Sequence, residues 1–219
     1  MNLPHSDRRY VIGLTGNIAT GKSAVMEILR RLGACTIDAD AVVHQVLSSN
    51  EAVRRAVIEE FGPGVLNADG SIDRAALGRV VFGNRRALAR LEAIVHPVVI
   101  RMVDDLIARA AERVIVVEAI KLIESGMHRG YDALWVVAAP PAQQLDRLVK
   151  QRGMDAADAR QRIAAQPPQE EKIAVADFVI YNDGPLADLE RRVTAEWQRI
   201  QRELDRPPAG GTRRTTGER

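Results

Sequence analysis

The stretch Gly16-Asn17-Ile18-Ala19-Thr20-Gly21-Lys22-Ser23 decides the fold, because it fits the pattern G-x-x-x-x-G-K-[ST] at every position. The apolar run before it, Tyr10–Thr15, predicts a buried strand, and the segment after it, Lys22–Leu32, has apolar residues at helical spacing. A strand, a glycine-rich turn and a helix in this order form a loop whose backbone N–H groups surround phosphate oxygens. The stretch therefore predicts a phosphate-binding loop at residues 16–23.

Two side chains of this loop have an expected role. The Lys22 ammonium group is expected to bridge the β- and γ-phosphates of a nucleotide, and the Ser23 hydroxyl to ligate Mg²⁺. The alternative, a chance glycine turn, is made rarer by the strand and helix on either side. Such loops serve kinases, motors and switches alike, so the motif names no reaction. The chain lacks the N-K-x-D motif of guanine switches and is small for a motor, which favours a small-molecule kinase.

Strands and helices alternate along the rest of the chain. Four further apolar runs predict strands, at Cys35–Asp38, Arg113–Ala119, Ala133–Ala139 and Phe178–Tyr181. The helices expected after the first are Ala39–Leu47, Glu51–Phe61, Asp73–Phe82, Arg85–Ala111 (with a kink or boundary at Pro97), Ala142–Arg152, Ala156–Ala165 and Pro185–Leu204. Continuous apolar strands separated by helices indicate parallel strands covered on both faces. The sequence therefore predicts an α/β fold of the P-loop NTPase type, a parallel five-stranded sheet flanked by helices.

The predicted elements divide the chain into four parts. Residues 9–48, 112–140 and 175–204 carry the strands and form the expected nucleotide-binding core. Residues 49–111 are helical and too long for a single crossover, so we expect an inserted helical substrate domain. Residues 141–174 are polar, charged helices suited to a closing lid. Residues 205–219 are rich in Pro, Gly and Arg, and we expect a disordered tail.

Composition excludes several classes of protein. The 219 residues suffice for one substantial domain, and 46% of them are hydrophobic. The net charge of +2 comes from the tail, which holds four arginines and two acids, so the body has no basic face and a nucleic-acid partner is not expected. No apolar run is long enough to span a membrane. A signal peptide is not expected, because MNLPHSDRRY contains no apolar stretch, and this expectation together with the single cysteine, Cys35, favours the cytoplasm. No His/Cys spacing predicts zinc.

Two carboxylates follow the second predicted strand. Ligands bind at the carboxyl edge of such sheets, so Asp38 and Asp40 can converge with the phosphate-binding loop. A carboxylate there can accept the proton of an attacking hydroxyl or hold Mg²⁺ through water. It can equally cap the next helix. We assign the structural role to Asp38 and the catalytic role to Asp40.

With these residues in view, the sequence resembles the dephospho-coenzyme A kinases. The resemblance runs from about Val11 to Trp197 and rests on segments in the family's order. They are GLTGNIATGKS (13–23), LGACTIDAD (32–40), FGPGVLNADGSIDRAAL (61–77), LEAIVHPVV (91–99), VIVVE (114–118), QLDRLVKQRG (144–153), RIAAQ (162–166), EEK (170–172) and ADFVIYNDG (176–184). The ordered set is far more specific than the loop alone.

The resemblance implies a reaction and its residues. The family transfers the γ-phosphoryl group of ATP to the ribose 3′-hydroxyl of dephospho-coenzyme A, with Mg²⁺, in the last step of coenzyme A synthesis. It implies that Ala19–Ala24 bind ATP together with Gly16 and Asn17, and that the insertion binds coenzyme A. The implied roles of single side chains are a base and metal organiser at Asp40, a lid arginine on the transferring phosphates at Arg147, a second lid candidate at Arg152, and substrate contacts at Arg74 and His96. A monomer or weak oligomer is expected.

Some residues keep two interpretations. Lys121 stands where the family usually has proline, and it either contacts a substrate phosphate or is a solvated loop residue. Glu118 either organises the metal or caps a turn. Arg147 and Arg152 are five residues apart and do not share a face of a straight α-helix, so at most one is expected to reach the γ-phosphate. Gln166 and Lys172 match family positions without an assigned chemistry.

Two rival functions are compatible with the same residues. The first is a kinase for another small alcohol or nucleotide, which the altered segment Ile120–Leu122 would favour. The second is a non-catalytic ATP-binding module that uses the basic tail as its contact. A panel of acceptors separates the first from the leading hypothesis. Substitution of Asp40 and deletion of Arg206–Arg219 separate the second rival function from the leading hypothesis.

Overall fold

A computed structural model describes residues 9–81 and 83–206. Five strands form one sheet in the order β2-β3-β1-β4-β5, and every neighbouring pair is parallel. The strands are β1 (Tyr10–Thr15), β2 (Cys35–Asp38), β3 (Val114–Glu118), β4 (Ala133–Ala138) and β5 (Phe178–Tyr181). All five predicted strands are confirmed. Their order places β3 between β1 and β2, which the sequence does not reveal.

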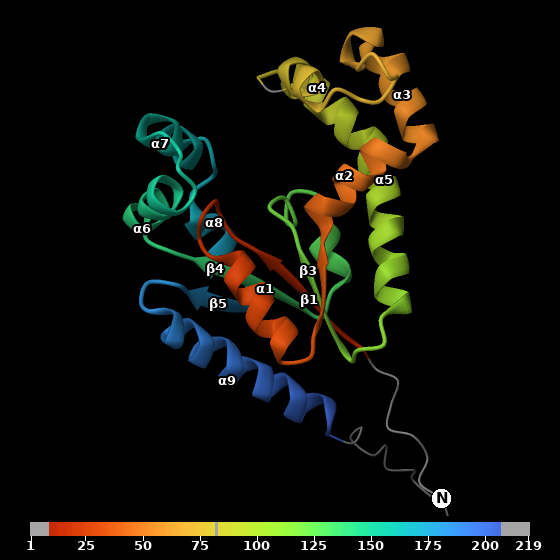
Figure 1. Ribbon diagram of the computed structural model, residues 1–219. Helices are drawn as coiled ribbons and strands as arrows, with labels where there is room; N and C mark the ends of the chain where they lie inside the picture. The colour runs from red at the N-terminus through yellow and green to blue at the C-terminus, as the bar shows by residue number, and fades with distance from the viewer. Residues whose placement is uncertain (1–8, 82, 207–219) are drawn as a thin grey trace, which may run out of the picture.

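Helices cover both faces of the sheet (Figure 1). They are α1 (Lys22–Arg31), α2 (Ala39–Ser49), α3 (Glu51–Phe61), α4 (Arg74–Val81), α5 (Arg85–Arg109), α6 (Pro141–Asp146), α7 (Ala156–Ala164), α8 (Gln169–Ile173) and α9 (Leu186–Leu204). Three single turns complete the set: η1 (Pro63–Val65), η2 (Met127–Gly130) and η3 (Arg147–Gln151), of which η3 is π-helical. The pairing of one continuous parallel sheet with helices on both sides is the predicted α/β architecture.

The core consists of two apolar layers, because successive side chains of a strand point to opposite faces. In β3, Val114 and Val116 pack with α1 and α9, whereas Ile115 and Val117 pack with α2 and α5. β4 alternates in the same way, with Trp135 wholly buried on the α1 and α9 side. The second layer extends without a break from the strands into α3 and α4, so the helical insertion and the sheet share one core.

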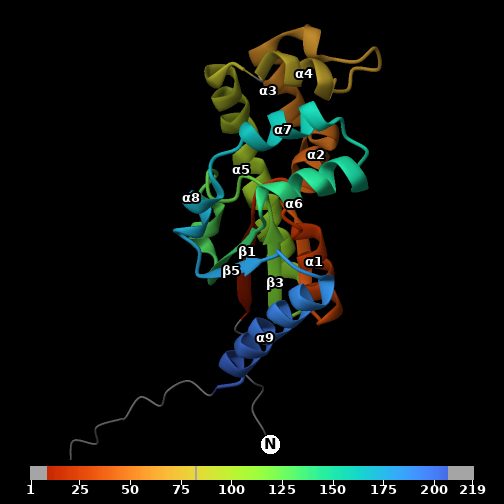
Figure 2. The same cartoon turned by 90° about the vertical axis from the view of Figure 1, so that its left-hand side faces the viewer.

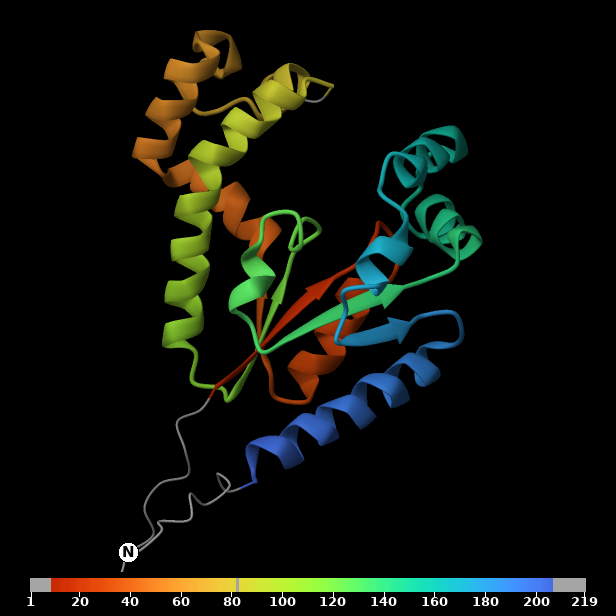
Figure 3. The ribbon, with the colours of Figure 1, turned by 180° about the vertical axis from the view of Figure 1, so that it is seen from behind.

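The helices α3 and α4 of the insertion and the segment α6–α7 lie beyond the carboxyl ends of the strands, whereas α5 runs back along the sheet (Figures 1 and 3). α2 leaves β2 directly and leads to α3 and α4, and the long helix α5 returns to the sheet. On the other side, α6, η3 and α7 follow β4, and Figure 2 shows them above the strands from the side. A small apolar cluster joins this segment to the phosphate-binding loop through Ala19, Leu148 and Ala159.

Several predicted boundaries differ from the structure. The helix expected over 142–152 ends as an α-helix at Asp146 and continues as the π-helical turn η3. Pro97 lies inside the unbroken helix α5 and marks no boundary. The helix expected to reach Phe82 ends at Val81 within the described residues, and Phe82 itself lies outside them. The expected disordered tail also lies outside them, except Asp205 and Arg206. None of the described helices is long and apolar enough to cross a membrane.

Candidate active site

The phosphate-binding loop leaves β1 at Gly16 and enters α1 at Lys22. Gly16 has φ 153° and Gly21 has φ 106°, values that favour glycine. A Cβ atom on Gly16 would overlap the carbonyl oxygen of Val137, so the loop packs against β4 without room for a side chain. Ala19 adopts φ 58°, the left-handed region that costs a non-glycine residue about 1–2 kcal/mol. The loop therefore has a specific, partly strained backbone.

Distant segments hold this backbone in place. Asn182, buried after β5, donates from Nδ2 to the Thr20 carbonyl oxygen at 2.8 Å. Gln166 accepts from the Ile18 N–H at 2.7 Å, and the Asn17 amide donates to the Pro167 carbonyl at 2.9 Å. These contacts satisfy polar groups of the loop that face the protein, and they keep its shape independent of any ligand.

Lys22 begins α1 and turns back over the loop. Its Nζ donates to the Gly16 carbonyl at 3.1 Å and to the Asn17 carbonyl at 3.4 Å, and it lies 3.6 Å from Glu118 Oε1. Burial lowers the pKa of Lys22, while the nearby carboxylates of Glu118 and Asp40 oppose that shift. The ammonium group thus lies between the loop and the acids of the neighbouring strands.

Three carboxylates gather at the ends of β2 and β3. Asp38 and Glu118 are register partners on these strands, and Asp40 is in the first turn of α2. One oxygen from each lies within 4.8 Å of the others. Asp38 accepts from the Ala41 N–H at 2.9 Å and so caps α2, whereas Asp40 Oδ2 accepts from the Ile120 N–H at 3.4 Å. These are hard oxygen donors beside a phosphate-binding loop with Ser23, a set that fits Mg²⁺.

Burial sets the protonation behaviour of two of these acids. It is the largest cause of the raised pKa of Asp40, and the negative charge of Asp38 adds to it. Burial likewise raises the pKa of Glu118, with Lys22 opposing the shift and Asp40 reinforcing it. A carboxyl group with a raised pKa holds its proton up to a higher pH than a free one.

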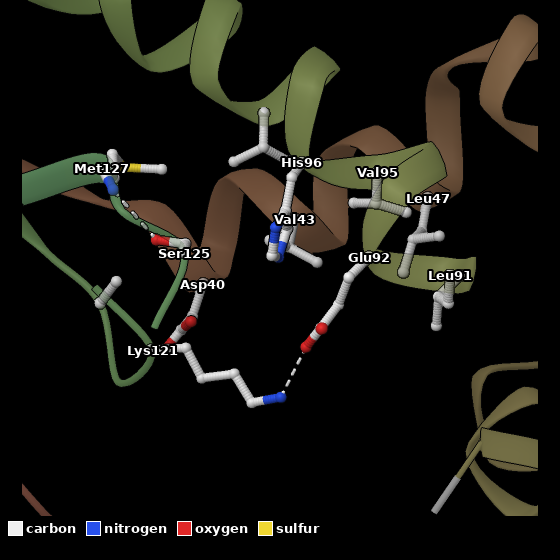
Figure 4. Close-up of a pocket in the computed structure, with 12 residues that line it drawn as sticks. Asp40, Val43, Leu47, Leu91, Glu92, Val95, His96, Lys121, Ser125 and Met127 are labelled. Carbon is white, nitrogen blue, oxygen red and sulfur yellow. Dashed lines mark hydrogen bonds and ion pairs between the residues drawn. The ribbon is translucent and has the colours of Figure 1, made fainter. Parts of the chain in front are cut away.

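Asp40 also lines a mostly apolar cavity of about 200 Å³ between the sheet and the insertion. Figure 4 shows Asp40 and Val43 from α2 and His96 from α5 among the residues that line it. Lys121, from the connection after β3, reaches across the opening to Glu92 of α5 with 2.7 Å between Nζ and Oε1. A cleft therefore joins Asp40 to the helical insertion.

A second cavity, of about 430 Å³, lies against the phosphate-binding loop. Its lining includes Lys22 and the exposed Ser23 from α1, Asn182 after β5, and both Arg147 and Arg152. Both arginines line this cavity, and the segment that joins them contains the π-helical turn η3, with backbone hydrogen bonds between residues five apart, in place of a straight α-helix. The assumption of a straight α-helix is therefore wrong, and the expectation that at most one arginine reaches the γ-phosphate stays a prediction.

The comparisons with known proteins agree on one family. The sequence model of the dephospho-CoA kinases matches residues 10–188. The chain belongs to the dephospho-CoA kinase family. A dephospho-CoA kinase of Streptomyces avermitilis is 45% identical over 197 residues, which cover 90% of this chain and 96% of that protein. One from Geobacter sulfurreducens is 42% identical over 190 residues, covering 85% of this chain and 96% of the relative.

Solved structures support the same fold. A crystal structure of a Thermus thermophilus protein, 33% identical, aligns with a TM-score of 0.77 over 89% of this chain and 99% of its own. A dephospho-CoA kinase from Campylobacter jejuni, 27% identical, aligns with a TM-score of 0.57 over 88% of this chain and 97% of its own. The chain is thus an enzyme, a phosphotransferase of the P-loop type that uses ATP.

The structure brings most of the predicted dephospho-CoA kinase residues to the two cavities. Asp40 and His96 line the first cavity, and Lys22, Arg147 and Arg152 line the second. Arg74 lines neither cavity; its guanidinium contacts His44 of α2 at 2.7 Å, outside the apolar pocket. The Arg74 assignment therefore has no geometric support from either cavity.

The roles of three polar residues were missed from the sequence. Asn182 and Gln166 brace the loop, as described above, and Lys172 is buried with its Nζ 2.8 Å from the Ile120 carbonyl and 3.2 Å from Glu124 Oε1. The N–H of the same residue, Ile120, donates to Asp40, so Lys172 holds the carbonyl group of the residue that contacts this acid. The available signal was their presence in the family segments RIAAQ, EEK and ADFVIYNDG; spacing alone does not reveal contacts between residues 52 to 162 positions apart.

Asp38 offers a prediction that separates capping from charge. Asp38→Ala removes the acceptor for the Ala41 N–H and is expected to lower the free energy of unfolding by about 1 kcal/mol. Asp38→Asn keeps an acceptor and is expected to unfold like the wild type in urea. Because the charge of Asp38 raises the pKa of Asp40, both variants are expected to lower that pKa in the metal-free protein, as followed by carboxyl ¹³C chemical shifts. An unchanged Asp40 titration in both would contradict this.

Arg147 offers a second prediction. Its Nη1 donates to the carbonyls of Ala19 and Thr20, both at 3.1 Å, and its Nη2 donates to the Asn182 carbonyl at 2.9 Å. Lysine cannot reproduce this fork, so Arg147→Lys is expected to raise the KM for ATP about tenfold by loosening the loop. Arg152→Lys is the matched control, since the structure gives Arg152 no such bonds among the described residues. Equal effects of the two variants would reject the bracing role.

Proposed function

We propose that this protein transfers the γ-phosphoryl group of ATP to the ribose 3′-hydroxyl of dephospho-coenzyme A, giving coenzyme A and ADP. This is the last step of coenzyme A synthesis. The observation that carries the proposal is the position of Asp40, which lines the cavity of the helical insertion and also lies in the acidic cluster beside Lys22. An alcohol in that cavity and a nucleotide on the loop would meet at this carboxylate.

In the proposed mechanism, the loop N–H groups and Lys22 bind the β- and γ-phosphates, with the nucleoside in the second cavity. The acceptor 3′-oxygen attacks the γ-phosphorus, the bond to the β,γ-bridging oxygen breaks, and Asp40 takes the hydroxyl proton. The raised pKa of Asp40 suits a base, because a carboxylate with a pKa closer to neutrality holds the proton better. Lys22 offsets the charge that develops on the leaving ADP.

We assign the metal role to Ser23 and Asp40, with Glu118 and Asp38 close enough to take part. Mg²⁺ bound there would neutralise charge on the phosphates during transfer. The Asp40 carboxylate would then orient both the ion and the acceptor hydroxyl. Glu118 is the residue for which the metal interpretation now outweighs turn capping, because its side chain lies 3.6 Å from Lys22 in the cluster.

The proposal extends to the surrounding segments. Residues 49–111 would bind the acceptor, because Leu91, Val95 and His96 of α5 line the cavity that holds Asp40. Residues 141–174 would act as the lid that excludes water, since Arg147 and Gln166 already contact the loop. All of these residues come from one chain, which is compatible with a monomer. A cytoplasmic location fits the free thiol of Cys35.

An acceptor panel tests the function. ADP release is measured in a coupled assay at saturating Mg-ATP with dephospho-coenzyme A, adenosine, AMP and shikimate, and ³¹P spectra identify the product. We expect ADP release that depends on dephospho-coenzyme A, with a new 3′-phosphomonoester signal. If no acceptor-dependent release occurs with dephospho-coenzyme A, the proposal fails, and release with another alcohol would identify a different kinase.

A further inference from the structure

We infer that Lys121 binds the diphosphate of the acceptor, and that Glu92 competes with this diphosphate for the Lys121 ammonium group. The inference rests on the proposed function, because it concerns the same cavity and a diphosphate-bearing acceptor. It assigns a ligand to a side chain that takes no part in the transfer itself. The evidence is the position of Lys121, the charges around it and the weakness of its present contact.

Lys121 lies at the opening of the acceptor cavity. It comes three residues after Glu118, at the end of β3, and lines the same cavity as Asp40. Figure 4 shows its side chain extended past Asp40 toward α5, where Nζ meets Glu92 Oε1 at 2.7 Å. An acceptor whose 3′-hydroxyl faces Asp40 would therefore have Lys121 within the same pocket as its phosphates.

The charges of the cavity require a cation for such an acceptor. Its lining contains two carboxylates, Asp40 and Glu92, and Lys121 is the one lysine or arginine among the lining residues. Each phosphoryl group of the acceptor adds negative charge, which two carboxylates at close range would repel. The Lys121 ammonium group, with three donors on a flexible stem, can follow a diphosphate as it enters.

The present ion pair is weak enough to exchange. The Lys121 side chain is 52% exposed and that of Glu92 is 32% exposed, so water screens their attraction. Exposed pairs of this kind contribute little to stability. In the free protein Glu92 keeps the lysine extended over the opening, and the acceptor's diphosphate then replaces the carboxylate as its partner.

Two variants of the same ion pair distinguish this role from a structural latch. Steady-state kinetics are measured with dephospho-coenzyme A and ATP for the wild type, Lys121→Met and Glu92→Gln. Lys121→Met is expected to raise the KM for dephospho-coenzyme A about tenfold. Glu92→Gln, which frees the lysine, is expected to lower that KM a few-fold. The KM for ATP should stay unchanged in both, and Arg202→Met is the control for removing an exposed cation, since Arg202 lies on α9 and lines neither cavity.

A salt series provides a second readout. The KM of the wild type for dephospho-coenzyme A is expected to rise more steeply with NaCl than that of Lys121→Met, since the lost contact is ionic. If the Lys121–Glu92 ion pair has only a structural role, both variants should raise the KM for dephospho-coenzyme A by the same factor. That result overturns the inference, and so does an unchanged KM in Lys121→Met. If the wild type itself does not phosphorylate dephospho-coenzyme A, it is the proposed function that fails.

Discussion

Replacing Asp40 with Asn is expected to lower kcat about 100-fold or more, with a small effect on the KM for ATP. Asparagine keeps an acceptor for the Ile120 N–H and nearly the same shape, but it cannot take the hydroxyl proton and holds a cation poorly. The loss should therefore appear in the transfer step. The measurement is coupled ADP release at saturating ATP and dephospho-coenzyme A, with Asp105→Asn, an exposed acid on α5, as the control.

The same substitution is expected to stabilise the metal-free protein at neutral pH. Because burial raises the folded pKa of Asp40, its stabilising contribution is present below the ordinary aspartate pKa and is lost as the pH rises through the raised value. Asparagine does not ionise, so the variant does not lose stability in this way as the pH rises. The difference in unfolding free energy between the variant and the wild type should therefore grow with pH. A variant that is both less stable and inactive would show that Asp40 acts through the fold instead.

Replacing Lys22 with Met is expected to lower kcat/KM for ATP by about 100-fold or more. Methionine keeps an unbranched chain but removes the ammonium group that faces the phosphates and lies 3.6 Å from Glu118. Lys22→Arg should not restore activity, because the Lys22 side chain is only 10% exposed and a planar guanidinium group is larger. Steady-state kinetics in both substrates test this.

Lys150→Met is the control for removing a lysine, since Lys150 is exposed and pairs with Asp146 in its own helical segment. Urea unfolding of each variant shows whether the fold is kept. A Lys22→Met protein that is folded and retains more than a tenth of the wild-type kcat/KM would exclude Lys22 from phosphate stabilisation. Full recovery in Lys22→Arg would show that the charge matters and the shape does not.

Much of the fold could be predicted because its signals are local. Parallel strands buried on both faces are continuous apolar runs, so β3 and β4 were found with boundaries within a residue of those observed. The short elements α8 and η3 could not be predicted, because a single helical turn is too short to show a periodic pattern of apolar residues. The helix predicted over Arg85–Ala111 is found as α5, and of the two alternatives at Pro97 only the boundary is wrong, because α5 continues through this residue.

The residues of the site likewise fall into those that could be predicted from the sequence and those that could not. Asp40 could be placed near the loop because strand ends converge at one edge, whereas the π-helical turn between Arg147 and Arg152, which line one cavity, could not be foreseen. The substrate contact that a family segment suggested for Arg74 stays a prediction, since the folded chain pairs this side chain with His44 outside both cavities. A resemblance to a family indicates which residues occupy matching positions, whereas the contacts of each side chain depend on how the whole chain folds.

The sequence by itself determined the phosphate-binding loop, the five strands and the candidate acid, because each depends on neighbours a few residues away. Only the tertiary structure decided the strand order, the acidic cluster with Glu118, the braces at Asn182, Gln166 and Lys172, and the pairing of Lys121 with Glu92. These depend on contacts between segments far apart in the chain, and such contacts form only when the sheet and its helices pack together.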